Sequence, residues 1–175
     1  MKRGPLLSVA LRYGAVAGIL AALLLIGTYY ISGHPLMISP FLDFRLLLLG
    51  VFVFFTLKEL RDIHQQGVLY FWQGMIGALV VVLSAGIIST GGMLIFGTLE
   101  NRFVADYIVE MEKYLRTFNP EAIAQVGKEM YERNLTLLPS TNIGDLATTY
   151  FVQGLVIGFF VSIILSVILR KHPKP

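Results

Sequence analysis

Side chains that could carry out chemistry are few in this sequence, and they do not form a recognisable catalytic or metal-binding group. Cysteine is absent, which excludes disulfides, thiolate nucleophiles and cysteine-ligated metals. The three histidines, His34, His64 and His172, lie far from one another and from carboxylate pairs at ligand spacing. We therefore expect no metal centre and no cofactor.

Acidic residues between positions 97 and 145 are the other candidates for chemistry. They could gather calcium, but they alternate with cations at helical spacing, a pattern typical of a solvated helix face. An enzyme would have to use these acids or, elsewhere in the chain, Arg61 and Asp62. Neither set resembles a catalytic constellation, and we predict that the protein is not an enzyme.

Ionisable residues are also missing from the middle of every long apolar segment. Intramembrane charges mark proton relays and ion pathways. Their absence argues against a proton-coupled transporter, including the small four-pass multidrug type that depends on a buried glutamate.

Composition explains where these segments belong. The 175 residues are 55% hydrophobic and only 14% charged, with a mean hydropathy of +0.72, whereas soluble domains carry about 25% charged residues. The missing charge indicates that lipid covers most of the surface. The length leaves room for one membrane domain, and we attribute the basic pI of 9.2 to membrane topology rather than to nucleic-acid binding.

Four long apolar segments predict an all-α polytopic membrane protein built as a four-helix bundle. The predicted spans are residues 11–31, 41–57, 71–96 and 146–169. We read the first as a retained span, because it is long for a signal peptide and no convincing cleavage site follows it. The second has a short apolar centre, so Asp43 and Arg45 are expected to reach toward the lipid headgroups.

A polar turn at residues 58–67 joins the second and third spans and makes them antiparallel neighbours. We single out Lys58, Arg61, Asp62 and Gly67 in this turn.

Residues 97–145 predict an amphipathic helical hairpin. Apolar residues recur at helical spacing with charged residues between them. We expect two helices that meet at Asn119 and Pro120, the second ending near Arg133. The candidate face toward the bundle, a partner or the membrane surface comprises Phe103, Tyr107, Met111 and Phe118.

Charge predicts the orientation of the spans. The N-terminus, the turn between spans two and three and the C-terminus hold eight cations and two acids, a balance of +6. The remaining loops hold six cations and nine acids, a balance of −3. Because cytoplasmic loops are enriched in Lys and Arg, both termini are expected in the cytoplasm and residues 97–145 outside it.

Small residues follow one face of two spans. The last span carries four at intervals of four, and the first span carries three. Such stripes let helix backbones approach closely in lipid. They predict packing within the bundle, most directly between these two spans, with an oligomer or partner interface as the alternative. The residues are Gly14, Gly18, Ala22, Gly154, Gly158, Ser162 and Ser166.

The turn also carries a family resemblance. The run KELRD at residues 58–62, Gly67 and FWQG at residues 71–74 resemble the cytoplasmic hairpin of a bacterial four-pass membrane family, domain-of-unknown-function family 4199. The stretch 154–171 resembles the end of its last span. The resemblance implies a bacterial inner-membrane protein, brings no known activity, and suggests lipid-linked glycosyltransferases as partners.

Two functions remain open from the sequence. The leading hypothesis is a non-enzymatic accessory or scaffold subunit of an inner-membrane complex, in contact with membrane lipids and with a membrane-protein partner or further copies of itself. The rival is a small carrier or binder of lipid or lipid-linked sugar, with a groove near the third span. Nucleic acid is not an expected partner.

Overall fold

The computed structural model describes residues 4–39 and 43–171, and every regular element within them is helical. The all-α prediction is confirmed. The α-helices are α1 (Pro5–Ser32), α2 (Phe44–Glu59), α3 (Phe71–Leu99), α4 (Phe103–Arg116), α5 (Pro120–Val126), α6 (Lys128–Leu137) and α7 (Ile143–Leu169). Three short helical turns are η1 (Pro35–Met37), η2 (Leu60–His64) and η3 (Leu138–Ser140).

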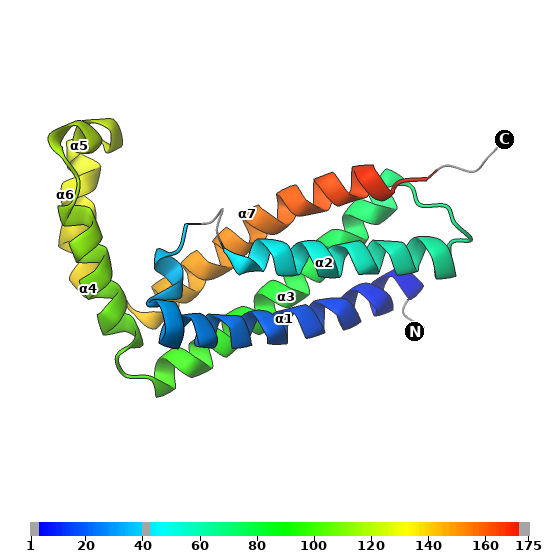
Figure 1. The fold of residues 1–175 in the computed structure, drawn as a ribbon, viewed down its shortest axis with the longest axis horizontal. Coiled ribbons are helices and arrows are strands. Elements are labelled where there is room, and N and C mark those ends of the chain that lie inside the picture. The colour runs from blue at the N-terminus through cyan, green and yellow to red at the C-terminus, as the bar shows by residue number, and fades with distance from the viewer. Residues whose placement is uncertain (1–3, 40–42, 172–175) are drawn as a thin grey trace.

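Three of the helices are long and apolar enough to cross a membrane: α1, α3 and α7, with 28, 29 and 27 residues. α2 has 16 residues, or about 24 Å at 1.5 Å per residue, which is shorter than a hydrocarbon core of about 30 Å. Residues 41 and 42 of the predicted second span lie outside the described residues. α2 nevertheless packs along α1, α3 and α7 (Figure 1).

Local sequence signals set the helix ends. Pro5 occupies the first turn of α1, where its missing N–H costs nothing. The Asp43 side chain caps α2 by accepting a hydrogen bond from the Arg45 N–H. At α7, the side chains of Asn142 and Asp145 bond each other's backbone N–H groups in a capping box.

α3 is the central helix of the packed core. It contacts α1 along one side and α7 along another. One buried cluster, which includes Val53, Leu57 and Val81, lies toward the turn between α2 and α3. A second cluster, which includes Met93 and Phe103, lies at the opposite end, where α4 begins.

The small-residue stripes pack mainly on α3 and not on each other. A Cβ atom added at Gly14 would lie 2.9 Å from the Val81 carbonyl oxygen, and one at Gly158 would lie 2.3 Å from the Val82 Cγ1 atom. The predicted pairing of the first and last spans is therefore wrong. α3 carries small residues of its own facing both neighbours, so it can be approached closely from two sides.

Most of the remaining stripe residues also face α3, and Gly154 is an exception. Gly18 faces Ile88 and Ala85, and Ala22 faces Gly92, all on α3. Ser166 faces Gly74 of α3, Ser162 is fully buried with its hydroxyl donating to the Gly158 carbonyl, and Gly154 faces Arg45 of α2.

The chain reverses between α2 and α3 more sharply than the sequence predicts. Lys58 is still within α2, and Arg61 and Asp62 belong to the π-helical turn η2. The reversal itself occurs at Gln66 and Gly67, which both have positive φ. The first part of the predicted polar turn is therefore helical, because the helical backbone hydrogen bonds continue from α2 into η2.

α4, α5 and α6 form an arm at one end of the long helices, and Figure 1 shows that it stands across their direction. Three helices replace the two that were predicted, because Gly127 breaks the second with φ of +92°. α6 then continues to Leu137, past the predicted end near Arg133. α4 is separate from α3, since residues 100–102 lie outside both helices.

Candidate functional site

The arm is held to the long helices by a junction around His34, in the segment between α1 and α2. The His34 ring is 1% exposed and lies 4.5 Å from the Phe103 ring and 5.1 Å from the Tyr107 ring, centroid to centroid. Tyr29 of α1 closes the same group of rings at 6.2 Å from His34. Tyr29 of α1, His34 just before η1, and Phe103 and Tyr107 of α4 thus share one aromatic cluster.

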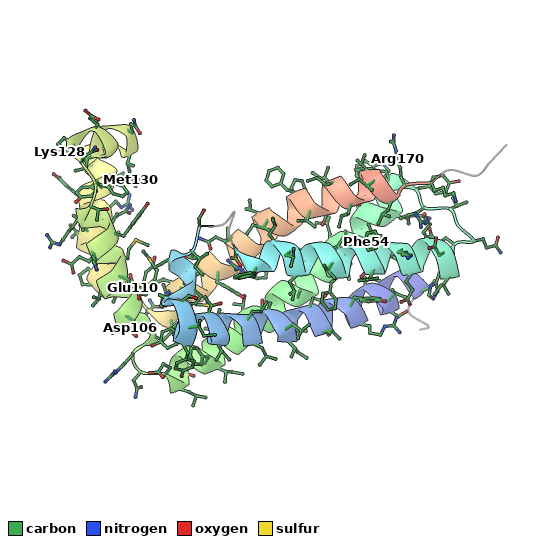
Figure 2. The ribbon with its side chains drawn as sticks, viewed as in Figure 1. Phe54, Asp106, Glu110, Lys128, Met130 and Arg170 are labelled. Atoms are coloured by element: carbon green, nitrogen blue, oxygen red, sulfur yellow. The ribbon has the colours of Figure 1, made fainter. Side chains whose placement is uncertain are left out.

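Carboxylates of α4 add hydrogen bonds to this junction. The Tyr29 hydroxyl donates to Asp106 Oδ2 at 2.7 Å, and the His34 backbone N–H donates to Glu110 Oε2 at 3.3 Å. Figure 2 shows Asp106 and Glu110 on the part of α4 nearest the long helices, whereas Lys128 and Met130 lie far out on the arm. The junction therefore anchors only the base of the arm.

Burial lowers the pKa of His34 to about 4, although the Asp106 carboxylate and the Phe103 backbone both act to raise it. The imidazole is therefore neutral at neutral pH. Its Nδ1 atom accepts a hydrogen bond from the Leu36 N–H at 3.3 Å. His34 therefore helps to hold the junction together as a neutral aromatic ring.

A hollow of about 310 Å³ opens where the arm meets the start of α7, and we call it the elbow. Apolar side chains from α4, α6 and η3 form its wall, and hydroxyl, amide and carboxylate groups form its edge. The lining residues are Tyr107, Met111, Leu115, Asn134, Leu137, Leu138, Thr141, Asp145, Leu146 and Thr149.

The lining of the elbow offers a surface for binding. No group of three or more His, Asp or Glu residues suited to a metal occurs among the described residues. Leu137 is 52% exposed although it lies beside the buried Leu138 and Leu146. An apolar wall with a polar edge is typical of a surface that receives another molecule.

The predicted partner face is only partly available. Phe103 is fully buried against α1 and α3, so it cannot touch a partner. Phe118 stacks on Tyr131 of α6 at 6.2 Å. Tyr107 and Met111 line the elbow. The spacing placed all four on one helix face, but the structure divides that face between the core, α6 and the elbow.

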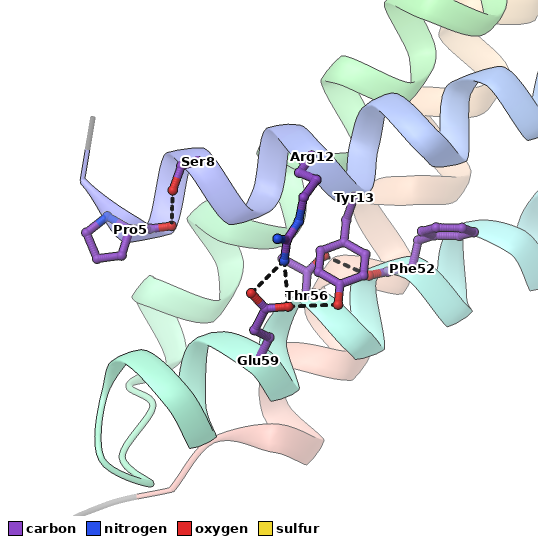
Figure 3. A network of polar contacts seen from close by, with 7 residues as sticks. All are labelled: Pro5, Ser8, Arg12, Tyr13, Phe52, Thr56 and Glu59. Atoms are coloured by element: carbon purple, nitrogen blue, oxygen red, sulfur yellow. Dashed lines mark hydrogen bonds and ion pairs between the residues drawn. The ribbon is translucent and has the colours of Figure 1, made fainter. Parts of the chain in front are cut away.

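At the opposite end of the molecule, Arg12, Glu59 and Tyr13 form a polar cluster that sequence reasoning missed (Figure 3). Arg12 Nη2 donates to Glu59 Oε1 at 2.7 Å, and the Tyr13 hydroxyl donates to Glu59 Oε2 at 2.8 Å. The sequence treats Arg12 and Glu59 only as topology charges. Their separation of 47 residues left no local signal of the pair.

The turn residues pair locally. Arg61 Nε donates to Asp62 Oδ1 at 2.7 Å, and this bond lowers the pKa of Asp62. Leu69 and Lys171 exchange two backbone hydrogen bonds of 2.9 Å, which ties the turn to the end of α7. Gly67 permits the reversal, and Lys58 remains exposed. Arg61, Asp62 and Gly67 therefore have a structural role in the turn.

Arg45 corrects another expectation. It does not reach outward to headgroups: it is only 8% exposed and forms an ion pair with Asp43. Its guanidinium carbon lies 4.1 Å from the centre of the Tyr150 ring, and Nη1 donates to the Tyr150 carbonyl at 3.2 Å. The pair is satisfied by α7, which explains why a charged residue can be buried there.

Comparison with known proteins gives one finding. The family model described as "Protein of unknown function (DUF4199)" matches residues 12–171, nearly the whole chain. This agrees with the resemblance seen in the turn between α2 and α3. Searches of curated proteins and of solved structures found no match.

Proposed function

We propose that this chain, which belongs to the DUF4199 family of proteins of unknown function, is a non-enzymatic accessory or scaffold subunit of a complex in the bacterial inner membrane. In this proposal the elbow receives the partner. The observation that carries it is the elbow itself, a half-apolar hollow between the arm and the first turns of α7.

The position of the elbow supports a membrane-protein partner. It lies at the end of α7, a helix long and apolar enough to span a membrane. A partner whose own spans lie beside α7 would therefore bring its extramembrane segments to the height of the arm. A soluble partner would have to approach along the membrane surface to reach the same hollow.

The charges of the arm favour binding through apolar contacts over binding through charge alone. Residues 103–137 hold six acids and four cations, and the pairs Arg116–Glu112 and Lys128–Glu132 neutralise part of this set. Exposed pairs of this kind contribute little energy. Binding at the elbow would then depend on contact with its leucines, Tyr107 and Met111.

We further propose that α2 serves as a fourth span, with both termini in the cytoplasm and the arm outside. α2 is short, but it packs along all three long helices. Asp43 and Arg45 at its start form an ion pair, and Arg45 also donates to α7, which reduces the cost of placing them near hydrocarbon. The family resemblance suggests a lipid-linked glycosyltransferase as the first partner to test.

Two matched variants test the elbow. Leu137→Asp places a charge on an exposed elbow residue, and Val109→Asp places one on an exposed arm residue outside it, with 52% and 65% of the side chains exposed. Each chain would be tagged, expressed in its native host and purified in mild detergent. We expect Leu137→Asp to lose a stoichiometric partner that Val109→Asp retains.

The partner must also contact the elbow directly. A photo-crosslinking amino acid at Leu137 should give a product of defined mass, and the same group at Lys113 on the exposed side of α4 should not. Retention of the partner by Leu137→Asp, or equal crosslinking from both positions, would overturn the proposal. A product of twice the chain mass would identify a second copy as the partner.

A further inference from the structure

A second open feature lies between α1 and α2. It is an apolar groove of about 610 Å³ near the arm end of the long helices. Seven of its nine lining residues are apolar or glycine, and the other two are Thr28 and Ser32. The lining residues are Leu20, Leu23, Leu24, Gly27, Thr28, Ile31, Ser32, Phe44 and Leu48.

The groove faces outward. Leu23 is 58% exposed, Ile31 86% and Phe44 65%. Its residues belong to α1, which can cross a membrane, and to the start of α2 beside it. Hydrocarbon is the solvent at this depth, so the most abundant molecules able to enter the groove are lipids.

Gly27 keeps the groove open. A Cβ atom added at this position would meet no atom within 4 Å. The small-residue stripe of α1 faces α3: Gly14, Gly18 and Ala22 all pack against it. Close packing of a further helix in lipid requires small residues along the contact face, and the groove offers Gly27 among bulky leucines and Phe44, with Thr28 and Ser32 only toward the end of α1. A flexible chain suits this wall better than a helix does.

The polar groups of the groove are at one end. Thr28 and Ser32 lie in the last turns of α1. A small pocket lined by Thr28, Asp43 and Arg45 adjoins the groove and shares Leu24 and Phe44 with it. A lipid tail in the groove would therefore have hydroxyl groups beside its ester region and an ion pair close to its headgroup.

We propose that the groove between α1 and α2 is a lipid-binding site that holds one acyl chain, with the ester group of the lipid at Thr28 and Ser32. This site goes beyond the partner-binding role proposed above and does not depend on it. The sequence suggests a lipid groove near the third span, whereas this groove lies between α1 and α2.

Two glycine variants test the site. Gly27→Leu fills the groove, whereas Gly50→Leu adds the same side chain on α2, where a Cβ atom also meets nothing within 4 Å but no groove lies. The proteins would be placed in vesicles of phosphatidylethanolamine and phosphatidylglycerol containing a phosphatidylethanolamine with a photoactivatable group in one acyl chain. Labelled positions would be mapped by mass spectrometry.

We expect labelling of the parent to concentrate on the groove residues of α1 and α2 over Ile87, an equally exposed residue of α3. Gly27→Leu should reduce it about tenfold, and Gly50→Leu should leave it unchanged. Uniform labelling of all exposed helix faces, or equal labelling in Gly27→Leu and the parent, would overturn the proposal.

A second measurement separates a lipid from another copy of the chain. The protein has no cysteine, so a single cysteine introduced at Leu23 can be crosslinked without background. Under the proposal, a short thiol crosslinker in the same vesicles gives no more dimer from Leu23→Cys than from Ile87→Cys. Efficient dimer formation from Leu23→Cys alone would assign the groove to a second copy and overturn the lipid site.

Discussion

His34 is a buried titratable group at the point where the arm joins the core. Its pKa is about 4 in the folded protein and about 6.5 when exposed. Because the folded value is lower, unfolded protein binds the proton first as the pH falls. The stability that the neutral His34 contributes is therefore fully present above pH 6.5 and is lost between about pH 6.5 and pH 4. The shift corresponds to about 3 kcal/mol.

This predicts that the parent protein in detergent becomes less thermostable as the pH falls from 7 to 4, and that His34→Phe reduces the loss. Phenylalanine keeps the ring contacts with Phe103 and Tyr107 and cannot bind a proton. Asp106 and Glu110 face the same junction and remain in both proteins, so the difference between the two melting curves isolates His34. Parallel curves would contradict the assignment.

Gly14 is the tightest glycine contact between α1 and α3. A Cβ atom there would lie 1.9 Å from Ser84 Oγ and 2.9 Å from a backbone oxygen, and the backbone cannot give way as a flexible side chain can. We predict that Gly14→Ala lowers the free energy of unfolding by about 1–3 kcal/mol. Gly91→Ala is the control, since its Cβ meets nothing within 4 Å. Equal melting temperatures would refute the close contact.

At the scale of elements, the arm depends on one backbone conformation. Gly127 joins α5 to α6 with φ of +92° and ψ of 124°, a combination that L side chains rarely adopt. A Cβ atom there meets nothing within 4 Å, so any effect of substitution is conformational. The two short helices need this break in order to pack on each other.

We predict that Gly127→Ala costs about 1–3 kcal/mol and loosens the arm alone. Hydrogen exchange should become faster in α5 and α6 and stay unchanged in α1, α3 and α7. An unaltered exchange pattern, or faster exchange throughout the chain, would show that Gly127 does not control the arm locally.

At the scale of the whole molecule, charge asymmetry predicts the topology. The side that carries both termini has a balance of +6 and the side that carries the arm −3. Reporter fusions after Gln66 and Lys174 should behave as cytoplasmic, and one after Asn134 as exported. Export of the Gln66 fusion would contradict both the orientation and the role of α2 as a span.

Local patterns in the sequence predicted most of the helices. Apolar runs located α1, α3 and α7, and Pro120 marked the start of α5. Gly127 could have revealed the third helix of the arm. These features are local, because a helix satisfies its own backbone hydrogen bonds and its ends depend on a few neighbouring residues.

Packing between helices was decided only by the tertiary structure. A stripe such as Gly14 and Gly18 shows that a helix can be approached closely, but every span with small residues is an eligible partner. The burial of Arg45 depends on Tyr150, 105 residues away. The elbow and the groove each form between different helices, and no local sequence signal identifies which helices will pack together. Packing depends on how shape and charge match across the whole contact.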